Sequence, residues 1–314
     1  MAVMLCAGFA ACGDDDNDEG GSGTVEAQAL VDNDGNQVRI TSVGDVEFNY
    51  DKKSRLVSFG NDDETYVING STITAPGTSY EYKLSTNSKG YITKMVISYN
   101  EKYDNGEYEK GSGTVSISYN GDGEITAVAG TGTSEYKEVY QGEVETGSEK
   151  STVSETFTWS NGNLKKIVSE SKGSYIEDGE PGSYSSVDTY TFTYGKTANV
   201  CRQYPYYVGN NVLGEGAGLL ALAGFFGVGT AYLPTGYTDA YTETYYDEKP
   251  YSNSKSYTLT YTLNSNGTID TEKRDNGKTI QYGYSDVTRA AMLANEVEAQ
   301  LPALKNMIFK RHRR

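Results

Sequence analysis

The sequence predicts an all-β fold: one long antiparallel meander that forms a soluble barrel or half-barrel, with a short inserted apolar helix and a C-terminal helix. Large apolar side chains alternate with Ser or Thr along most of the chain, which is the period of strands with one buried and one wet face. Short turns rich in Asn, Gly, Asp and Ser separate these runs, as in β-hairpins.

Four regions are expected in chain order. Residues 1–11 read as a lipoprotein signal peptide, and residues 12–28 as an acidic, Gly-rich flexible linker. Residues 29–284 carry the strand pattern and form the antiparallel β domain. Residues 285–314 form the C-terminal helix and its basic tail.

The first region ends in Phe-Ala-Ala-Cys at Cys12 and resembles a bacterial lipobox, in which the cysteine is lipidated. No Lys or Arg precedes Cys12, whereas a secretory n-region is positively charged. We therefore expect a signal peptide that is truncated at its start. The acidic run at 14–19 is similar to a surface-export signal of some Gram-negative bacteria, and its plainer interpretation is a solvated linker. Together these features predict a lipid-anchored outer-membrane protein facing the cell surface.

The alternation is clearest in four runs. Their apolar positions are Val115, Ile117 and Tyr119; Phe157 and Trp159; Tyr190, Phe192 and Tyr194; and Tyr257, Leu259, Tyr261 and Leu263. Ser or Thr occupies every position between them. We expect the aromatic and aliphatic side chains to be buried and the Ser/Thr face to be exposed.

The turns share a pattern that recurs at a spacing of about 35 residues, and this regularity indicates repeated hairpins. Each unit has an apolar strand end, a few turn residues and an apolar residue that opens the next strand. The units are Tyr50–Leu56, Leu84–Ile92, Tyr119–Ile125, Trp159–Leu164, Tyr194–Val200 and Leu263–Ile269. The unit Tyr50-Asp51-x-x-x-Arg55-Leu56 resembles the YD repeat of bacterial secreted and RHS-type proteins, and the other units are degenerate.

A lipobox, degenerate YD-like hairpins and the segment from Leu219 to Pro234 together resemble the lipoprotein family named domain of unknown function 4595. The resemblance implies a porin-like fold and no established activity. A membrane-spanning barrel is the alternative to a soluble one. A lipid anchor would be redundant for such a barrel, and spanning barrels usually end on an aromatic-terminated strand, so a soluble barrel is favoured.

The apolar insertion lies near 213–228. The uncharged stretch 216–233 has the minimum length of a membrane span, but its five glycines weaken a helix. A single span would also place the two halves of one sheet on opposite sides of a membrane. We expect instead a short buried helix at about Leu219–Phe226 that covers the apolar face of the curved sheet.

The C-terminal helix is expected to begin at Ser285 or Asp286, either of which can cap it. Apolar residues spaced three and four apart follow, from Val287 to Ile308, and form one stripe. Its basic tail complements the helix dipole or docks on the acidic body of the protein or on anionic lipid.

Composition excludes several kinds of chemistry. A net charge of −16 disfavours nucleic acid and anionic surfaces. The single histidine, His312, lies in the tail, so no His-based triad or His metal cluster is expected in the body. Cys201 is the one cysteine expected to survive processing as a free thiol, and we expect it to be buried. No catalytic residue, metal or cofactor is predicted.

Tyrosine is the remaining signal, with 28 residues. Tyr204, Tyr206, Tyr207, Tyr241, Tyr245 and Tyr246 are the candidate ligand-binding residues, as two exposed clusters. The plainer interpretation is that Tyr favours strands. The function predicted first is a non-catalytic binding or structural envelope protein, with a glycan or another envelope protein as partner. The alternative is a carrier of an apolar ligand inside the barrel, and a hydrolase with paired carboxylates ranks third.

Overall fold

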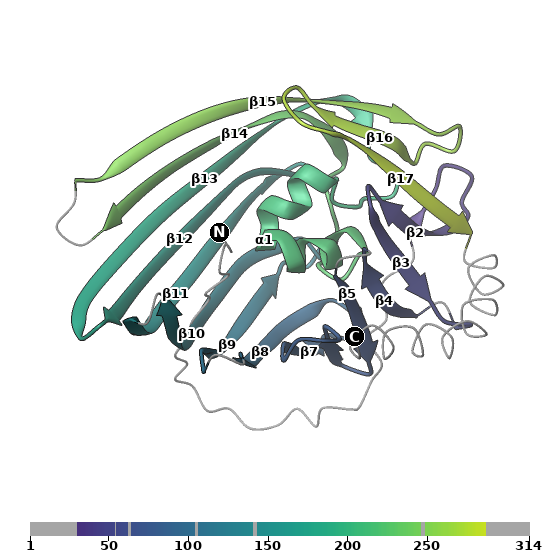
Figure 1. The fold of residues 1–314 in the computed structure, drawn as a ribbon. Helices are drawn as coiled ribbons and strands as arrows, with labels where there is room; N and C mark the ends of the chain where they lie inside the picture. The colour runs from purple at the N-terminus through teal and green to yellow at the C-terminus, as the bar shows by residue number, and fades with distance from the viewer. Residues whose placement is uncertain are drawn as a thin grey trace.

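The computed structural model of the protein describes residues 30–53, 55–61, 64–103, 106–140, 143–245 and 249–286, with the backbone alone at 140, 143 and 210–217. These residues form a closed antiparallel sheet with one helix inside it (Figure 1).

The short strands of the first half are β1 (Leu30–Val31), β2 (Gln37–Val43), β3 (Val46–Tyr50), β4 (Leu56–Gly60), β5 (Thr65–Asn69), β6 (Thr72–Thr74) and β7 (Glu81–Thr86). The longer strands that follow are β8 (Ile92–Lys102), β9 (Tyr108–Tyr119), β10 (Ile125–Tyr140), β11 (Glu143–Ser160), β12 (Asn163–Glu177) and β13 (Glu180–Ala198). Helix α1 (Tyr206–Leu222) precedes β14 (Tyr232–Tyr245), β15 (Tyr251–Leu263), β16 (Ile269–Arg274) and β17 (Thr279–Asp286).

Strands β2 to β17 form a closed barrel of 16 strands, in which each strand pairs antiparallel with its chain neighbours and β17 pairs with β2. Strand β1 pairs with β2 beside this closure. The predicted continuous antiparallel meander is therefore confirmed, and of the two expected forms the barrel is the closed one.

The alternation has the expected burial along most of its length; the exception is Leu263, which is 41% exposed at the irregular end of the β15–β16 pairing. Phe157 and Phe192 are buried in the main apolar core, and Trp159 is half-buried with its indole N–H donating to the Ile125 carbonyl at 2.7 Å. The threonines between them, such as Thr156 and Thr191, are exposed. The period-two alternation therefore predicts which face of the sheet packs on the core and which face is exposed to solvent.

Four hairpin turns share one mechanism. At Asp51, a side-chain oxygen accepts the backbone N–H groups two and four residues on, at 2.8 and 2.9 Å. Asp32, Asn87 and Asn120 do the same at the starts of their turns. The fourth residue of the Asn120 turn, Gly123, has φ 85°, a left-handed conformation that glycine adopts without steric cost. The Asn/Asp-Gly chemistry thus specifies the turns by side-chain capping of the backbone.

The unit expected at Tyr194–Val200 is not a hairpin. Strand β13 continues to Ala198, and the chain then leaves the sheet for α1 before it returns as β14. Gly195 and Thr197, which are residue types common in turns, lie within strand β13, so the turn-like composition does not mark a turn here.

Helix α1 occupies the interior, but its bounds differ from the expectation. It begins at Tyr206 and ends at Leu222, whereas Phe225 and Phe226 follow it in a turn that carries Gly224 and Gly227 at positive φ. Both phenylalanines have no exposed surface, and Leu220 and Leu222 are buried with them in the core. The prediction that this segment covers the apolar face of the sheet is therefore confirmed. The glycines in the segment have a low helix propensity, but tertiary packing of the helix outweighs it.

The expected start of the C-terminal helix at Ser285 or Asp286 is wrong. Both residues belong to β17 and pair with Arg39 and Val38 of β2. Ladder pairing at the barrel closure outweighs the capping preference of Ser and Asp. The rest of that predicted helix, from residue 287 on, lies outside the described residues.

Candidate functional site

The long strands extend beyond the apolar core as an open curved sheet (Figure 1). Strand β15 pairs with β16 only over Leu259–Leu263, so its first half lies outside the closed part of the barrel. We call the part of β8–β15 between the core and the strand ends at Lys102, Tyr140, Glu177 and Tyr245 the sheet extension. Its inner face is the one that carries Phe157, Ile167 and Phe192, and its outer face is the opposite one.

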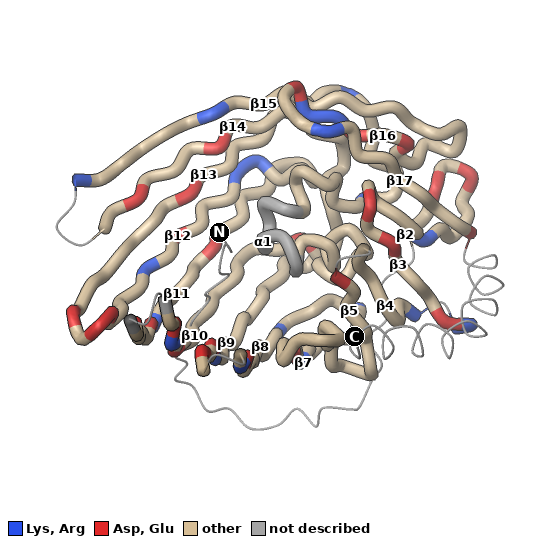
Figure 2. Tube along the Cα trace, in the orientation of Figure 1, with Lys and Arg blue, Asp and Glu red and all other residues tan. Residues whose placement is uncertain are grey.

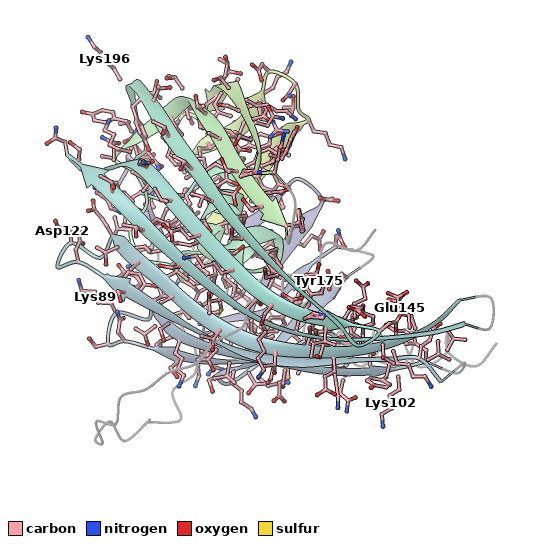
Figure 3. The ribbon with its side chains drawn as sticks, turned by 90° about the vertical axis from the view of Figure 1, so that its left-hand side faces the viewer. Lys89, Lys102, Asp122, Glu145, Tyr175 and Lys196 are labelled. Carbon is pink, nitrogen blue, oxygen red and sulfur yellow. The ribbon has the colours of Figure 1, made fainter. Side chains whose placement is uncertain are left out.

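Charged residues occur along the whole length of β8–β15 (Figure 2), and the strand register places the two signs of charge on opposite faces of the sheet. In the regularly paired and described parts, the inner face holds eleven acidic residues and one lysine, Lys255. The acidic residues are Glu101, Glu109, Glu138, Glu145, Glu149, Glu155, Glu177, Glu180, Asp188, Asp239 and Glu243. The outer face holds seven lysines and two glutamates, namely Lys94, Lys102, Lys110, Lys137, Lys150, Lys166, Lys172, Glu135 and Glu170. Figure 3 shows Lys102 on one side of the sheet and Glu145 and Tyr175 on the other. The inner face is thus a surface that repels anions.

Tyrosines of the inner face lie across glycines of the neighbouring strand. Tyr99, Tyr136, Tyr175 and Tyr184 stand directly opposite Gly111, Gly147, Gly182 and Gly173 in the strand register. A Cβ atom at any of these glycines would overlap the tyrosine ring, so each ring covers the bare backbone of its partner. The four rings are half-buried. Each ring therefore lies along the sheet over its partner glycine, and the Tyr99 ring is also stacked on the Tyr80 ring, with the ring centroids 4.8 Å apart.

Two of these tyrosines reach a carboxylate on the strand beyond the glycine. Tyr184 on β13 crosses β12 at Gly173 and donates to Glu149 Oε1 on β11 at 2.5 Å. Tyr136 on β10 crosses β11 at Gly147 and bonds with Glu177 Oε1 on β12 at 3.4 Å. A Tyr–Gly–Glu arrangement over three strands therefore occurs twice on the inner face.

Three acids lie where the sheet extension meets the core. Glu155, Asp188 and Asp239 come from β11, β13 and β14, and Tyr190 pairs directly with Asp239. Burial raises the pKa of Glu155 to about 8; a hydrogen bond from Ser169 opposes the shift, and the Asp188 charge adds to it. Burial and then the neighbouring acids also raise the pKa of Asp188. With a pKa of about 8, the Glu155 carboxyl is mostly protonated at pH 7, so it can donate as well as accept a hydrogen bond.

Part of this acidic group lacks partners. Within the described residues, Glu155 Oε2 and Asp239 Oδ1 are buried and make no hydrogen bond. Burial raises the pKa of Asp239, and Lys255 across the β14–β15 pair opposes that shift. Buried polar atoms without a partner are uncommon in native proteins, and they make this end of the inner face the polar candidate site.

The first predicted tyrosine cluster is not exposed. Tyr204 and Tyr207 are buried and Tyr206 is half-buried, because these residues lead into and begin α1 inside the barrel. The Glu272 carboxylate of β16 accepts the Tyr206 N–H at 2.7 Å and the Tyr207 N–H at 3.4 Å, and so caps the helix. The expectation of an exposed site at these three residues is therefore wrong.

The second cluster is placed differently. Tyr241 is half-buried and Tyr245 is 48% exposed, both on the inner face of β14. The Tyr241 ring lies 5.8 Å from the Tyr251 ring across β14 and β15. Tyr246 and Cys12, the predicted lipidation residue, lie outside the described residues.

The predicted free thiol, Cys201, is buried, as expected, and burial raises its pKa to about 12. Such a thiol is unreactive at neutral pH.

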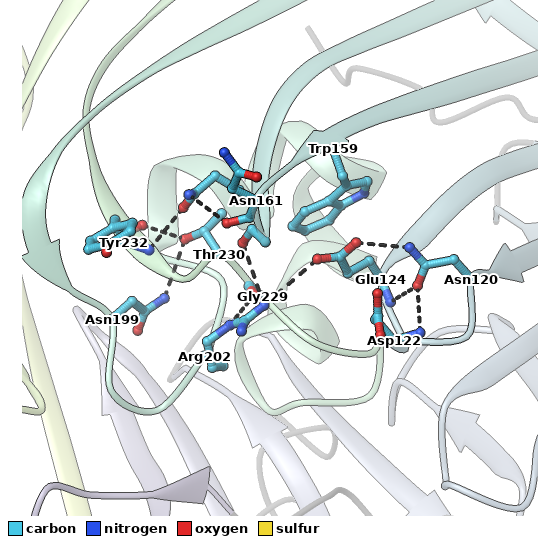
Figure 4. Close-up of polar contacts among 12 residues, drawn as sticks. Asn120, Asp122, Glu124, Trp159, Asn161, Asn199, Arg202, Gly229, Thr230 and Tyr232 are labelled. Carbon is cyan, nitrogen blue, oxygen red and sulfur yellow. Dashed lines mark hydrogen bonds and ion pairs between the residues drawn. The ribbon is translucent and has the colours of Figure 1, made fainter.

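A polar network closes the end of the barrel opposite the sheet extension (Figure 4). Arg202 Nε donates to the Gly229 carbonyl at 2.9 Å, and its guanidinium lies 3.8 Å from the buried carboxylate of Glu124. Asn120 Nδ2 donates to the same carboxylate at 2.8 Å. These bonds hold the segments on either side of α1 against the β9–β10 turn, which is a structural role.

Two kinds of site are absent from the described part of the chain. No group of three or more His, Cys, Asp or Glu residues there is arranged to hold a metal ion. None of its helices has the length and apolar character needed to cross a membrane.

Comparison with known proteins gives a likeness of fold. No family model matches the sequence, and no curated protein matches it. Among solved structures, a porin-like protein from Bacteroides vulgatus is similar with a TM-score of 0.40 and 14% identity, over 78% of this chain and 98% of that chain. A porin-like protein from Bacteroides uniformis is similar with a TM-score of 0.26 and 14% identity, over 71% of this chain and 93% of that chain.

Sequence reasoning missed the acidic inner face, although a signal was present. Glu155, Asp188 and Asp239 each occupy a position of the alternation that should be apolar if the inner face were core along its whole length. Glycines opposite tyrosines, in contrast, need the strand register, and the register is not visible in the sequence before the hairpins are aligned.

Proposed function

We propose that this protein is an exported, non-catalytic binding lipoprotein that holds a glycan on the inner face of its sheet extension. The observation that carries the proposal is the set of tyrosine rings laid across glycines of the neighbouring strand, at Tyr136, Tyr175 and Tyr184. A ring that lies along a sheet is suited to stack on the apolar face of a sugar, and the phenol hydroxyl supplies a hydrogen bond at its edge.

The charge of the same face narrows the class of glycan. Carboxylates such as Glu149 and Glu177 accept hydrogen bonds from sugar hydroxyls, and the mostly protonated Glu155 can also donate one. Because the inner face is almost uniformly acidic, glycans with sulfate, phosphate or uronate groups would be repelled. A neutral or amine-bearing glycan fits best.

We further propose that a lipid on Cys12 anchors the protein at the outer membrane, with the barrel in water at the cell surface. The outer face of β9–β15 supports this arrangement, since its positions are mostly Ser, Thr and Lys, whereas a spanning barrel carries an apolar band outside. The Asp51–Arg55 turn supports the YD-like resemblance, with the two side chains in an ion pair at 2.5 Å. In the same proposal, residues before Cys12 are a signal peptide and the hairpin turns are degenerate YD-like repeats. The chain would then be a member of the family named domain of unknown function 4595.

The packed interior favours a binder over a carrier of an apolar ligand. Leu222, Phe225, Phe226, Leu164 and Ile167 have no exposed surface and belong to one contiguous cluster around α1. A carrier of an apolar ligand would need an unfilled cavity inside the barrel, where these side chains pack. An envelope protein remains the alternative partner for the same inner face.

The test is binding of soluble polysaccharides by affinity electrophoresis and calorimetry. Xylan and dextran are the neutral probes, chitosan oligomers the amine-bearing probe and polygalacturonate the anionic probe. Tyr136→Ala should weaken binding about tenfold, since a ring–ligand stack contributes about 1–1.5 kcal/mol. Tyr108→Ala is the matched control, because Tyr108 lies on the outer face of β9 and is also half-buried.

The proposal predicts binding of a neutral or amine-bearing probe that Tyr136→Ala weakens and Tyr108→Ala does not. Binding of none of these probes would contradict it. Equal losses in the two variants would also do so, because the inner face would then have no special role.

A hydrolase is the second candidate, favoured by one observation. Glu155, with its raised pKa, lies two strands from Asp188 on the same face, and a protonated acid beside a second carboxyl is the minimum set for glycoside cleavage. Release of reducing sugar from the probes above, abolished by Glu155→Gln and retained by Glu170→Gln, would favour the hydrolase. Binding without release favours the non-catalytic protein.

A further inference from the structure

Strand β15 has an edge that no described strand covers. From Tyr251 to Thr258 it pairs with β14 on one side, and its pairing with β16 begins only at Leu259. Figure 1 shows β15 as the outermost strand of the sheet extension. Most residues of this segment are exposed, and Tyr251 is 56% exposed. An unpaired strand edge is a template for pairing with another extended chain.

The contacts of Thr258 show which backbone groups face this edge. Its N–H donates to Asp275 Oδ2 and its carbonyl accepts the Asp275 N–H, both at 3.1 Å, on the side away from β14. In an antiparallel strand, alternate residues direct both backbone groups to the same side. Ser252, Ser254 and Ser256 therefore direct theirs to the open edge. A contact of Ser254 is consistent with this direction: its N–H donates to Asn253 Oδ1 at 2.7 Å and not to β14.

We propose that this edge pairs with the same edge of a second copy of the chain, antiparallel and about a two-fold axis at Ser254. The pairing sets Ser254 opposite Ser254 of the second copy, and Ser252 opposite Ser256. Ser252 and Ser256 then exchange backbone hydrogen bonds as a directly opposed pair, and Ser254 does so at the axis when its N–H leaves the Asn253 side chain for the second copy. An interface of this kind is closed and uses the same surface on both copies.

The side chains of the segment are self-complementary in this register. On the inner face, Tyr251 stands opposite Tyr257 of the second copy, which is a favourable cross-strand aromatic pair. Lys255 stands opposite Asn253, so no like charges meet. A two-fold axis one residue further on, at Lys255, would set two ammonium groups opposite each other and is disfavoured.

The pairing would join two sheet extensions into one continuous sheet. The inner face runs on from β14 and β15 of one copy to β15 and β14 of the other, with both copies on the same side. This association does not depend on the glycan proposal and can be tested without any ligand.

The experiment measures the molar mass of the full chain by light scattering and sedimentation, in the Cys12→Ala background to remove acylation. Ser254→Lys should make the protein monomeric, because two lysines would then face each other across the axis. Ser252→Lys is the matched control. It adds the same charge to the same face of the same strand, but the new lysine would stand opposite Ser256. Circular dichroism confirms that each variant retains the fold.

The expected result is a dimer for the parent and for Ser252→Lys, and a monomer for Ser254→Lys. A mixture of Ser254→Lys and Ser254→Glu chains should recover the dimer, because opposite charges would then face each other. A parent that stays monomeric up to its solubility limit would overturn the proposal. A dimer that Ser254→Lys leaves intact would also overturn it, since another face would then hold the copies together.

Discussion

The Tyr184 hydroxyl donates to Glu149 Oε1 at 2.5 Å although β12 lies between their strands. Gly173 makes this possible, because any side chain at that position of β12 would occupy the path of the ring. The same relationship joins Tyr136 to Glu177 across Gly147. Glycine in a strand usually weakens the sheet, and a close approach of another group is one of the accepted reasons for it. Here the approaching group is an aromatic ring on the inner face.

Gly173→Val should destabilise the protein by about 1–3 kcal/mol. The new side chain overlaps the Tyr184 ring, so that the ring must move and its bond to Glu149 is lost. Chemical denaturation of the purified protein measures the change in the free energy of unfolding.

Ser174→Val is the control for that substitution. Ser174 is the next residue of β12, exposed on the outer face, where a β-branched side chain suits the strand. We expect a change within about 0.5 kcal/mol. A similar loss of stability in both variants would show that valine destabilises β12 on either face. The loss in Gly173→Val could then not be assigned to the contact between Gly173 and the Tyr184 ring.

Glu155→Gln should make the protein less sensitive to pH. The folded-state pKa of Glu155, about 8, lies above its ordinary value of 4.5. Between pH 4.5 and 8 the folded protein therefore holds a proton that the unfolded chain has released, and the free energy of unfolding falls as the pH rises through that window. Glutamine cannot ionise and removes this contribution.

Thermal melts at a series of pH values measure the effect. The difference in melting temperature, Glu155→Gln minus parent, should increase from pH 4.5 to 8 and stay constant above pH 8. Each 1 kcal/mol of difference in the free energy of unfolding corresponds to about 2–4 °C. Glu170→Gln is the control, since Glu170 is exposed on the outer face of β12. Parallel curves for the parent and Glu155→Gln would mean that this carboxyl titrates normally.

The sequence was sufficient to predict the strands, because period-two alternation is a local property. Phe157 and Phe192 are buried for the reason that the pattern indicates. It was not sufficient for the ends of elements whose partners are distant in sequence. Ser285 lies in a strand because Arg39, on β2, completes the ladder there. Tyr206 begins a helix because Glu272, on β16, accepts its N–H.

The candidate site was predicted less well than the fold. Tyr204 and Tyr207 were chosen for exposure, yet they lie in the core because the chain after β13 enters the barrel. A tyrosine on an alternating strand can lie against the apolar core or on the sheet extension. Which of the two it does depends on how far its strand extends beyond the shorter strands of the barrel. That length difference, between β10–β13 and the short β2–β7, is a property of the whole barrel.

Asp51→Ala should cost about 1–2 kcal/mol of stability. It removes the acceptor of two backbone N–H groups and the ion pair with Arg55. Burial opposes the ionisation of Asp51, but the bonds from Arg55 and from the backbone of Lys53 and Arg55 outweigh it and lower the pKa of the carboxyl. Asp51→Asn is the control, because the chain itself uses asparagine for this turn at Asn87 and Asn120. We expect Asn to retain most of the stability in urea denaturation; equal losses for Ala and Asn would assign the effect to the ion pair alone.

Cys12→Ala should move the protein from the membrane fraction to the soluble fraction of the cell. The physical reason is the loss of the acyl chains, each methylene of which contributes about 0.8 kcal/mol to membrane binding. Fractionation followed by immunodetection measures the distribution, and Cys6→Ala serves as the control because Cys6 lies within the expected signal peptide. Unchanged partitioning of Cys12→Ala would remove the basis for the proposed anchor.

Phe225→Ala should destabilise the protein by about 3–5 kcal/mol, the range for a buried phenylalanine. Phe225 has no exposed surface, and its carbonyl accepts the Ile92 N–H at 2.9 Å, so the residue joins the segment after α1 to the wall of the barrel. Thermal and urea melts in detergent-free buffer measure the loss, and Val187→Ala is the control, because Val187 is 40% exposed on the outer face of β13. A Phe225→Ala variant that melts like the parent would mean that the interior rearranges to fill the space. The filled interior would then no longer favour a binder over a carrier of an apolar ligand.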